Sequence, residues 1–596
     1  MRLPLHFAVL AGFFSVEIAP SHASLATPPT SPTPSDSDFL NQRKVAQNLP
    51  PIAPPENLQP DSNQNRFLQP VPTPIPAPNP TESPVLPTPT SEPTPDVNVV
   101  PIQVNRIEVT GSTVLSSEQL NRITKPFEGS TVSFQELTSV IDEINQLYLE
   151  QGYTNSRAIL EAQTIANGVV QIRVFEGTLE RIEVEGTRRL NPNYVRSRVN
   201  LGVGTPLNTT KLEEQLRLLR ADPLFKNVEA TLRSGSGPGQ SILVVRVTEA
   251  DPFEASVSFD NYSPPSVGSE RLGINASYRN LTGNGDELAA SYYRTTTGGA
   301  DVFDFSYRIP LNAMNGTLQL RAAPNRNEVT QSPFDEFDIR GESQLYEISY
   351  RQPLIRSLRQ EFALSLGFAY QSGQTFTFAG PTPFGFGPDE QGVSRTSVIK
   401  FGQDYLRWDS LGVWSLRSQF SFGTGLFNAT TNPDSIPDGR FISWLGQVQR
   451  VQLLNKNNLL ILQADLQLTP DALLPSQQFI IGGGQSLRGY RQNVRAGDNG
   501  LRFSVEERIT LQRDEAGNAI FQLAPFVDLG TIWNVSDNPN KLQKQRFLAS
   551  VGLGLLWQPL SNLSVRLDYG LPLVNLDDRG ENVQDSGFYF SVNYKL

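Results

Sequence analysis

The printed sequence ends in Phe588-Tyr-Phe-Ser-Val-Asn-Tyr-Lys-Leu596, in which apolar and more polar side chains alternate. Because successive side chains of a strand point to opposite faces, this segment predicts a β-strand with one apolar and one polar face. The same alternation occurs at 253–260 and 563–570, and turn-forming Gly, Asn, Asp and Pro residues separate such segments from residue 251 onward. Residues 251–596 are therefore predicted to fold as β-structure.

Strands of a soluble β-sandwich also alternate between apolar and polar side chains, but the length of these segments indicates a membrane barrel. About 9–11 residues with a wholly apolar face is the length that a tilted strand needs to cross a bilayer. Trp557, Tyr569 and Phe588 lie near strand ends, where aromatic side chains form interfacial girdles. At roughly 20–22 residues per strand and connection, 251–596 holds about 16 strands, which predicts an outer-membrane β-barrel.

A repeat precedes this region. Ile107-Glu-Val-x-Gly111 recurs 75 positions later as Ile182-Glu-Val-x-Gly186. Ser133 and Glu136 form a capping-box pattern before an amphipathic segment that stops at Gly152. Each copy reads strand, helix, helix, strand, strand, so 102–177 and 178–250 are predicted to be two small α+β domains, each with one sheet face covered by helices.

The N-terminal hundred residues predict a leader and a linker. Arg2 and the apolar run from Phe7 to Val16 are typical of a secretory signal peptide, which we place at 1–23. Residues 28–101 contain 21 of the 46 prolines, which predicts a disordered tether over 24–101. The segment 36–48 lacks proline and is a candidate short helix.

Composition excludes several kinds of chemistry. His6 and His22 lie in the predicted signal peptide and the chain has no cysteine. The mature protein therefore lacks the residues for a Ser-His-Asp triad, a cysteine nucleophile, a Cys/His zinc site or a His- or Cys-bound haem. The net charge of −11 argues against nucleic acid as a partner. We expect no catalytic residues, no metal and no cofactor.

One glycine-rich segment is distinctive. Gly483-Gly-Gln-Ser-Leu-Arg-Gly-Tyr490 precedes Gly497-Asp-Asn-Gly500. An arginine between apolar and glycine residues indicates a tight turn that packs against something, and a buried guanidinium needs a carboxylate partner. Phe526-Val-Asp-Leu-Gly530 offers one, because alternation points Asp528 away from Val527 and Leu529 and therefore towards the barrel lumen.

These two motifs resemble the long inward-folded loop and the companion strand of the outer-membrane translocases that carry POTRA (polypeptide-transport-associated) domains. The 75-residue repeats look like two POTRA domains. Two such domains between a proline-rich tether and a barrel of about 16 strands resemble the two-partner secretion transporters of the haemolysin or filamentous-haemagglutinin secretion type. The resemblance covers 102–596.

The resemblance implies roles for specific residues. Arg488 would dock on Asp528 inside the barrel. The loop tip would consist of Ser486, Leu487, Arg488, Gly489 and Tyr490, and the companion motif of Phe526, Asp528 and Gly530. The segment 36–48 lies where related proteins carry a helix that plugs the pore. Many related barrels end in Phe, which the assembly machinery reads, whereas this chain has Leu596.

The implied function is secretion rather than catalysis. In the outer membrane of a Gram-negative-type bacterium, periplasmic POTRA domains would capture an unfolded exoprotein, which the barrel would conduct and help to activate by two-partner (type V) secretion. Partners would be the large exoprotein, outer-membrane lipid and, during biogenesis, the barrel-assembly machinery. The alternative is an outer-membrane protein assembly or insertion factor of the same superfamily. A passive porin and an outer-membrane hydrolase fit less well.

Overall fold

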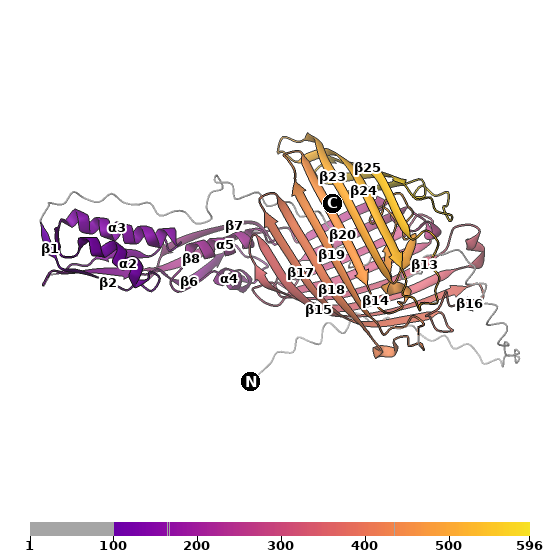
Figure 1. The fold of residues 1–596 in the computed structure, drawn as a ribbon, viewed down its shortest axis with the longest axis horizontal. Helices are drawn as coiled ribbons and strands as arrows, with labels where there is room; N and C mark the ends of the chain where they lie inside the picture. Colours follow the sequence, from indigo (N-terminus) through magenta and orange to yellow (C-terminus); the bar gives the residue numbers. More distant parts are fainter. Residues whose placement is uncertain (1–100, 164, 166, 434) are drawn as a thin grey trace. The chain divides into compact units, whose positions relative to one another are not determined.

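The computed structural model describes residues 101–596 except 164, 166 and 434. The predicted signal peptide, the candidate helix at 36–48 and the tether before residue 101 lie outside the described residues. The described chain forms two α+β units followed by a closed antiparallel barrel, so the predicted fold class is confirmed (Figure 1). Among the described residues, no helix combines the length and the apolar character needed to cross a bilayer.

The first α+β unit contains a three-stranded sheet in the order β2-β5-β4, with β2 parallel to β5. Its elements are β1 (Ile102–Val104), β2 (Arg106–Thr110), α2 (Ser117–Thr124), η2 (Lys125–Phe127), β3 (Ser130–Val132), α3 (Phe134–Glu150), β4 (Arg157–Leu160) and β5 (Val169–Phe175). The small β1–β3 pair was not predicted, because three-residue strands leave no periodic signal.

Helix α3 begins and ends as its sequence predicts. The Ser133 side chain accepts the Glu136 N–H while the Glu136 carboxylate accepts the Ser133 N–H, which completes the capping box. Gly152 follows the helix with a φ of +83°, a left-handed conformation that disfavours other residues. Leu137, Val140, Ile144 and Tyr148 recur at helical spacing and are all buried against the sheet.

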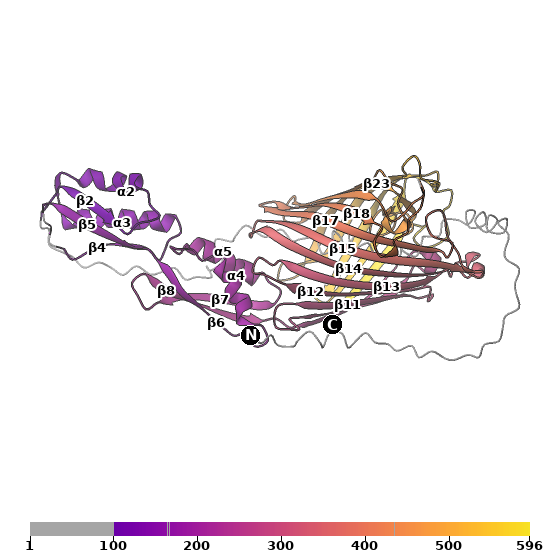
Figure 2. The ribbon, with the colours of Figure 1, turned by 90° about the horizontal axis from the view of Figure 1, so that it is seen from below.

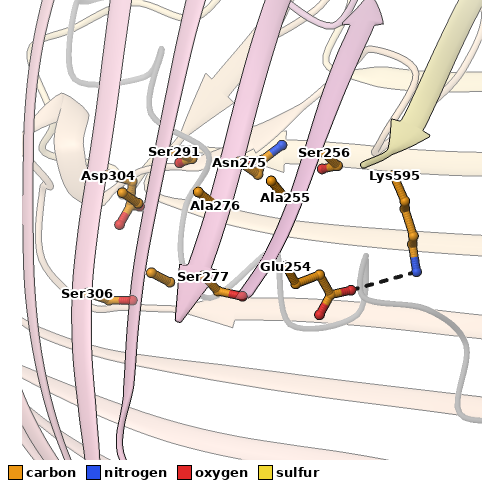
Figure 3. Close-up of a pocket in the computed structure, with 12 residues that line it drawn as sticks. Glu254, Ala255, Ser256, Asn275, Ala276, Ser277, Ser291, Asp304, Ser306 and Lys595 are labelled. Atoms are coloured by element: carbon orange, nitrogen blue, oxygen red, sulfur yellow. Dashed lines mark ion pairs between the residues drawn. The ribbon is translucent and has the colours of Figure 1, made fainter. Parts of the chain in front are cut away.

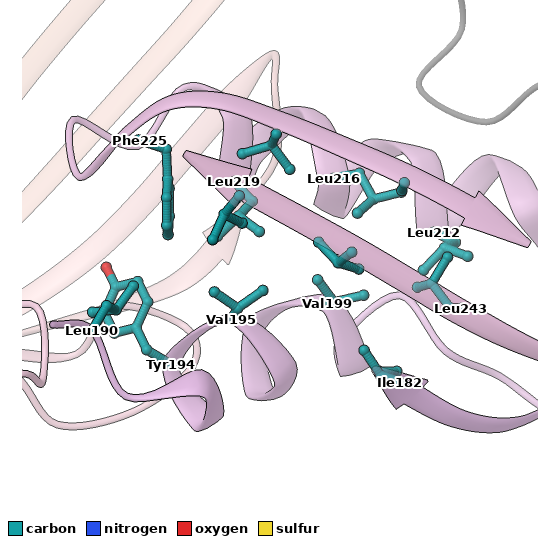
Figure 4. Close-up of a cluster of buried hydrophobic side chains, with 14 of the residues drawn as sticks. Ile182, Leu190, Tyr194, Val195, Val199, Leu212, Leu216, Leu219, Phe225 and Leu243 are labelled. Carbon is teal, nitrogen blue, oxygen red and sulfur yellow. The ribbon is translucent and has the colours of Figure 1, made fainter. Parts of the chain in front are cut away.

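The second unit repeats this plan. It consists of β6 (Thr178–Glu185), α4 (Pro192–Asn200), α5 (Thr209–Arg220), β7 (Phe225–Ser234) and β8 (Gln240–Glu249), with sheet order β6-β8-β7. Figure 2 shows α4 and α5 together on one side of these strands. Val195, Val199, Leu212 and Leu216 of the helices meet Leu243 of the central strand in a continuous apolar core (Figure 4).

The structure explains why the repeat keeps a glycine. Gly111 follows β2 and Gly186 follows β6, with φ values of +83° and +88°. A Cβ atom on either residue would overlap the carbonyl oxygen of the central strand, from Val174 or Val247 respectively. Only glycine permits both the left-handed turn and this close approach.

A glutamate at the end of each central strand holds the segment that follows this glycine, and the repeat in the sequence did not predict it. Glu176 accepts the backbone N–H groups of Thr113 and Val114. Glu249 accepts those of Arg188, Arg189 and Leu190, at 2.7–3.0 Å for Oε1. Burial alone would raise the pKa of the Glu249 carboxyl, but these donors outweigh it and hold its pKa below the usual value.

We expect this carboxylate to make the second unit sensitive to acid. A lowered folded-state pKa gives stability that is present above the unfolded pKa of about 4.3 and is lost as the pH falls through the folded value. Glu249→Gln should cost about 1–3 kcal/mol at neutral pH and remove the pH dependence. Hydrogen-exchange protection factors of the 188–190 amides measure both effects; equal protection in wild type and variant would contradict the expectation.

Sixteen strands of the described chain close the barrel, and β27 pairs with β9. They are β9 (Phe253–Asp260), β10 (Arg271–Arg279), β11 (Glu287–Thr295), β12 (Ala300–Pro310), β13 (Thr317–Glu328), β14 (Arg340–Arg356), β15 (Gln360–Thr377), β17 (Val393–Asp409), β18 (Gly412–Thr424), β19 (Ile442–Leu453), β20 (Asn458–Leu468), β23 (Asn499–Arg513), β24 (Ala519–Trp533), β25 (Phe547–Leu560), β26 (Leu563–Pro572) and β27 (Phe588–Lys595). The two-residue β16 (Gly380–Pro381) pairs only with the end of β15, which itself pairs with β17.

The strands differ in length from the expectation. The predicted segments had about 9–11 residues, whereas the observed strands have between 8 and 18. Longer strands extend beyond an apolar band that about ten residues can cross. Apolar and polar residues alternate only where one face of the strand lies in that band. Alternation therefore predicts the part of the strand that crosses the membrane and not the part that extends beyond it.

The two faces of the wall follow the predicted alternation. Val527 is 42% exposed on the outer face and its neighbour Asp528 is fully buried on the inner one. The side chains of Trp557, Tyr569 and Phe588 are exposed on the outer face, and the rings of Tyr569 and Phe588 lie 4.7 Å apart. The outer face is thus apolar with aromatic residues near strand ends.

Candidate functional site

A long connection between β20 and β23 folds into the barrel lumen. It contains a short antiparallel pair, β21 (Phe479–Ile481) and β22 (Arg495–Gly497). Its apolar side chains form one buried cluster with inward-facing residues of β19, β24 and β25, including Leu445, Ile532 and Leu548. The connection therefore packs on the inner wall instead of extending into solvent.

The loop tip is the tight turn that its glycines predict. The Gly483 N–H donates to the Leu487 carbonyl oxygen at 3.1 Å, and the Ser486 hydroxyl donates to the Gly482 carbonyl oxygen at 2.8 Å. Leu487 is fully buried against Gly530, where a Cβ atom would lie 2.7 Å from the Leu487 methyl group. Glycine at 530 thus makes room for the tip.

Arg488 and Asp528 meet in the lumen. The guanidinium donates from Nε at 2.7 Å and from Nη2 at 2.9 Å to the two oxygens of Asp528, and the Arg488 backbone N–H donates to the same carboxylate. The Arg488 Cζ atom also lies 3.4 Å from the centre of the Phe526 ring. A bidentate pair with an aromatic face behind it fixes both the position and the orientation of the tip.

Three partners of this pair were not identified from the sequence. Glu506 of β23 accepts a second bond from Arg488 at 2.6 Å, and Asp568 of β26 lies 3.6 Å from the guanidinium. Arg566 pairs with both of these carboxylates, at 2.8 Å and 2.7 Å. Alternation already places Asp568 on the polar face of its strand, but only the register of β23, β24 and β26 shows that these groups converge.

Tyr490 anchors the other side of the tip. Its hydroxyl lies 2.7 Å from the Ala549 carbonyl oxygen and accepts the backbone N–H of Val574 at 3.2 Å. The Tyr589 hydroxyl donates to the Tyr490 carbonyl oxygen. Between Arg488 and Tyr490, Gly489 has a φ of +94° and lies against Gly570 of β26. The tip is therefore held by the wall on both sides.

Asp498 of the second glycine motif fixes the base of the loop. Its carboxylate is fully buried and accepts the backbone N–H groups of Leu473 at 2.9 Å and Val535 at 3.1 Å. The Asn538 amide donates to the same group at 2.8 Å. These bonds join both ends of the inward loop to the β24–β25 connection.

The loop is also joined to the junction of the first and last strands. β9 and β27 pair over five described residue positions. The Asn261 amide lengthens this junction, because it donates to the Phe588 carbonyl oxygen at 3.0 Å and accepts the Phe590 N–H at 2.8 Å. Gln584 then donates to the Asn261 carbonyl oxygen and accepts the N–H of Gln492 in the loop.

A hollow of about 380 Å³ lies on the inner wall formed by β9 to β12 (Figure 3). Its inward side chains include the small Ser256, Ser277 and Ser291 beside the larger Asn275 and Asp304. At its margin, Glu254 lies 3.9 Å from Lys595. Hydroxyl groups of this kind can donate to or accept from a peptide backbone of any sequence.

The geometry is that of a closed barrel with an internal loop docked on its inner wall. Among the described residues, no group of three or more His, Cys, Asp and Glu side chains is arranged to hold a metal ion. The buried charges instead neutralise one another between the loop and the wall, which holds the loop in one position.

The comparisons with known proteins agree with this architecture. Residues 239–556, more than half of the chain, match the family model described as haemolysin secretion/activation protein ShlB/FhaC/HecB. The chain belongs to this haemolysin secretion/activation family. Residues 102–177 also match the model of the ShlB-type POTRA domain.

Individual relatives of this family member are distant but cover most of its length. The outer membrane transporter CdiB of Escherichia coli O6:K15:H31 (strain 536 / UPEC) is 24% identical, over 80% of this chain and 79% of its own. The heme/hemopexin transporter protein HuxB of Haemophilus influenzae (strain 86-028NP) is 23% identical, over 78% of this chain and 83% of its own. The predicted family resemblance, outer-membrane localisation and secretion function are thereby confirmed.

Solved structures show the same fold. CdiB from Escherichia coli matches with a TM-score of 0.66 and 21% identity, over 95% of this chain and all of that one. CdiB from Acinetobacter baumannii matches with a TM-score of 0.59 and 16% identity, over 94% of this chain and 98% of that one. These structures show the fold, and membership of the family makes this chain an outer-membrane transporter with periplasmic POTRA domains.

Proposed function

We propose that this transporter exports one large exoprotein, which its POTRA domains at 102–177 and 178–250 receive unfolded from the periplasm and its barrel at 251–596 conducts outward and helps to activate. The observation that carries the proposal is the docked loop tip at Arg488, which occupies the lumen through a charge network. No cofactor or metal enters the proposed cycle.

Substrate capture is assigned to the sheet edges of the POTRA domains. In the second unit, β8 lies between β6 and β7. Within the described chain, the ten-residue β7 is therefore an edge strand of this sheet. An extended polypeptide can add to such an edge through main-chain hydrogen bonds, which require no particular side-chain sequence. Capture by this means suits an unfolded substrate.

Conduction is assigned to the lumen. Ser486, Leu487, Arg488, Gly489 and Tyr490 on the loop, with Phe526, Asp528 and Gly530 on β24, form the proposed gate. Its movement would open the path beside the inner wall formed by β9 to β12. Energy would come from folding of the exoprotein outside the cell.

Two further partners follow from the barrel surface. The apolar outer face of the strands is proposed to contact outer-membrane lipid. The alternating strand β27 (Phe588–Lys595) is proposed to be read by the barrel-assembly machinery during biogenesis.

Depletion of the protein tests secretion against the assembly alternative. We expect one large exoprotein to disappear from the culture medium while other outer-membrane proteins keep their abundance, as quantified by mass spectrometry of both fractions. Complementation with the wild-type chain is the control. A general loss of outer-membrane barrels would overturn the secretion proposal and indicate an assembly factor.

A further inference from the structure

The connection after β18 begins with an unusual backbone. Phe427 has a φ of +54° and Asn428 a φ of +56°, so two successive non-glycine residues adopt the left-handed conformation. Asparagine tolerates this region, whereas a phenylalanine there is uncommon and costs conformational energy. Such a conformation persists only where the surrounding structure holds it.

Both ends of this segment are tied to the neighbouring strand β17. The Thr424 hydroxyl donates to the Ser397 carbonyl oxygen at 2.9 Å. The Thr430 N–H donates to the Arg395 carbonyl oxygen at 2.9 Å, and the Arg395 N–H donates back to the Thr430 hydroxyl. Residues 425–429, which we call the outer tab, therefore lie between two points of attachment to β17.

The tab presents apolar side chains on the outer face of the barrel. Leu426 is 53% exposed and Phe427 is 67% exposed. The Phe427 ring lies 5.6 Å from that of Phe368 and 6.5 Å from that of Tyr370. Both rings share their face of β15 with Leu366, which is 60% exposed, so Phe427 continues the apolar outer surface.

The height of the outer tab above the periplasmic end of the barrel follows from the position of its contact residue Tyr370 along β15. The barrel begins at β9 after the periplasmic POTRA domains and each strand reverses direction, which places the β18–β19 connection at the extracellular end. Tyr370 is ten residues beyond Gln360, the first residue of β15. At about 3.3 Å per residue and a tilt of about 40°, it lies roughly 25 Å above that start, the height of the apolar band.

We propose that Leu426 and Phe427 of the outer tab insert into the lipid of the outer leaflet at the boundary between headgroups and hydrocarbon. The tab is continuous with the lipid-facing surface, its side chains are apolar, and its strained backbone directs them outward. The inference rests on the proposed contact between the barrel and lipid. The outer tab would hold the barrel at a fixed depth, because aromatic side chains such as Phe427 favour the boundary between membrane and water.

The absence of cysteine from the chain allows single-site labelling of the full protein. Leu426→Cys, Phe427→Cys, Leu366→Cys and Phe378→Cys variants would each carry a nitrobenzoxadiazole label in dioleoylphosphatidylcholine vesicles. Phe378 is 72% exposed and directly follows β15, eight residues beyond Tyr370, which places it roughly 20 Å farther along the barrel axis. It is the matched control.

We expect phosphatidylcholine with a doxyl group at carbon 5 to quench the labels at 426 and 427 at least about twofold, and more than the 12-doxyl lipid does, as for interfacial residues. The label at 378 should keep its emission. If the labels at 426 and 427 respond like the label at 378, the tab proposal is wrong. If the label at 366 also fails to respond, the lipid contact itself is wrong. Heat-modifiable gel mobility verifies that each variant is folded.

Discussion

Replacing Arg488 with alanine is expected to abolish secretion and to destabilise the barrel by about 3–5 kcal/mol, because a buried charge pair loses one partner. Asp528 would remain buried with no guanidinium, since Arg566 contacts Glu506 and Asp568 instead. Arg488→Lys should restore little, because one ammonium group cannot contact both oxygens of Asp528 and also Glu506. Thermal unfolding and exoprotein release measure the two effects.

The controls separate the docked loop from a general arginine effect. Arg326→Ala removes an exposed arginine that lies 3.6 Å from an exposed Glu342, and should change stability by less than about 1 kcal/mol. Arg488→Ala combined with Asp528→Ala should destabilise less than the sum of the single variants, because the two groups interact directly. Normal secretion by the Arg488→Ala variant at wild-type barrel levels would contradict the proposal that the loop tip gates the barrel.

A methyl group on Gly570 is expected to displace the loop tip without removing any charge. The added Cβ atom would lie 2.5 Å from the Gly489 nitrogen and 2.9 Å from the Arg488 carbonyl carbon. These are backbone atoms that cannot rotate away, so Gly570→Ala should overpack the contact by about 1–3 kcal/mol. We expect a higher single-channel conductance in planar bilayers, because the displaced loop leaves more of the lumen open.

Gly367→Ala is the matched control on a distant part of the inner wall. There the added Cβ atom would meet Ser349 at 3.2 Å and no atom of the inward loop. Its conductance should equal that of the wild type. Equal conductance of the Gly570→Ala variant, with an unchanged unfolding temperature, would show that the tip does not limit the channel.

The sequence was sufficient for those features that depend on local periodicity. Alternation predicted the strands and the inward direction of Asp528, and the capping box at Ser133 predicted the start of α3. The strand extensions were not predicted because they lie outside the apolar band. The β1–β3 pair was not predicted because strands of three residues are too short to show a period. Alternation made Asp528 a candidate partner of Arg488, and the family resemblance then implied that the two residues pair.

Glu506 and Arg566 were missed for a different reason. They lie on strands separated by many residues, and their meeting depends on barrel register, which no single segment of sequence specifies. A search for charged residues on the polar faces of the last strands would have found them as candidates. It would not have selected them, since a wet lumen carries many such residues.

The docking site of Arg488 also links the loop to the assembly of the barrel wall. Glu506, Asp528 and Asp568 lie on β23, β24 and β26, so the complete set of acceptors exists only where these three strands share one sheet. A wall without β26 would still offer Glu506 and Asp528 to the arginine, but it would lack Asp568 and the second cation, Arg566. The full charge network is therefore a property of the closed barrel, and loop docking is coupled to completion of the wall.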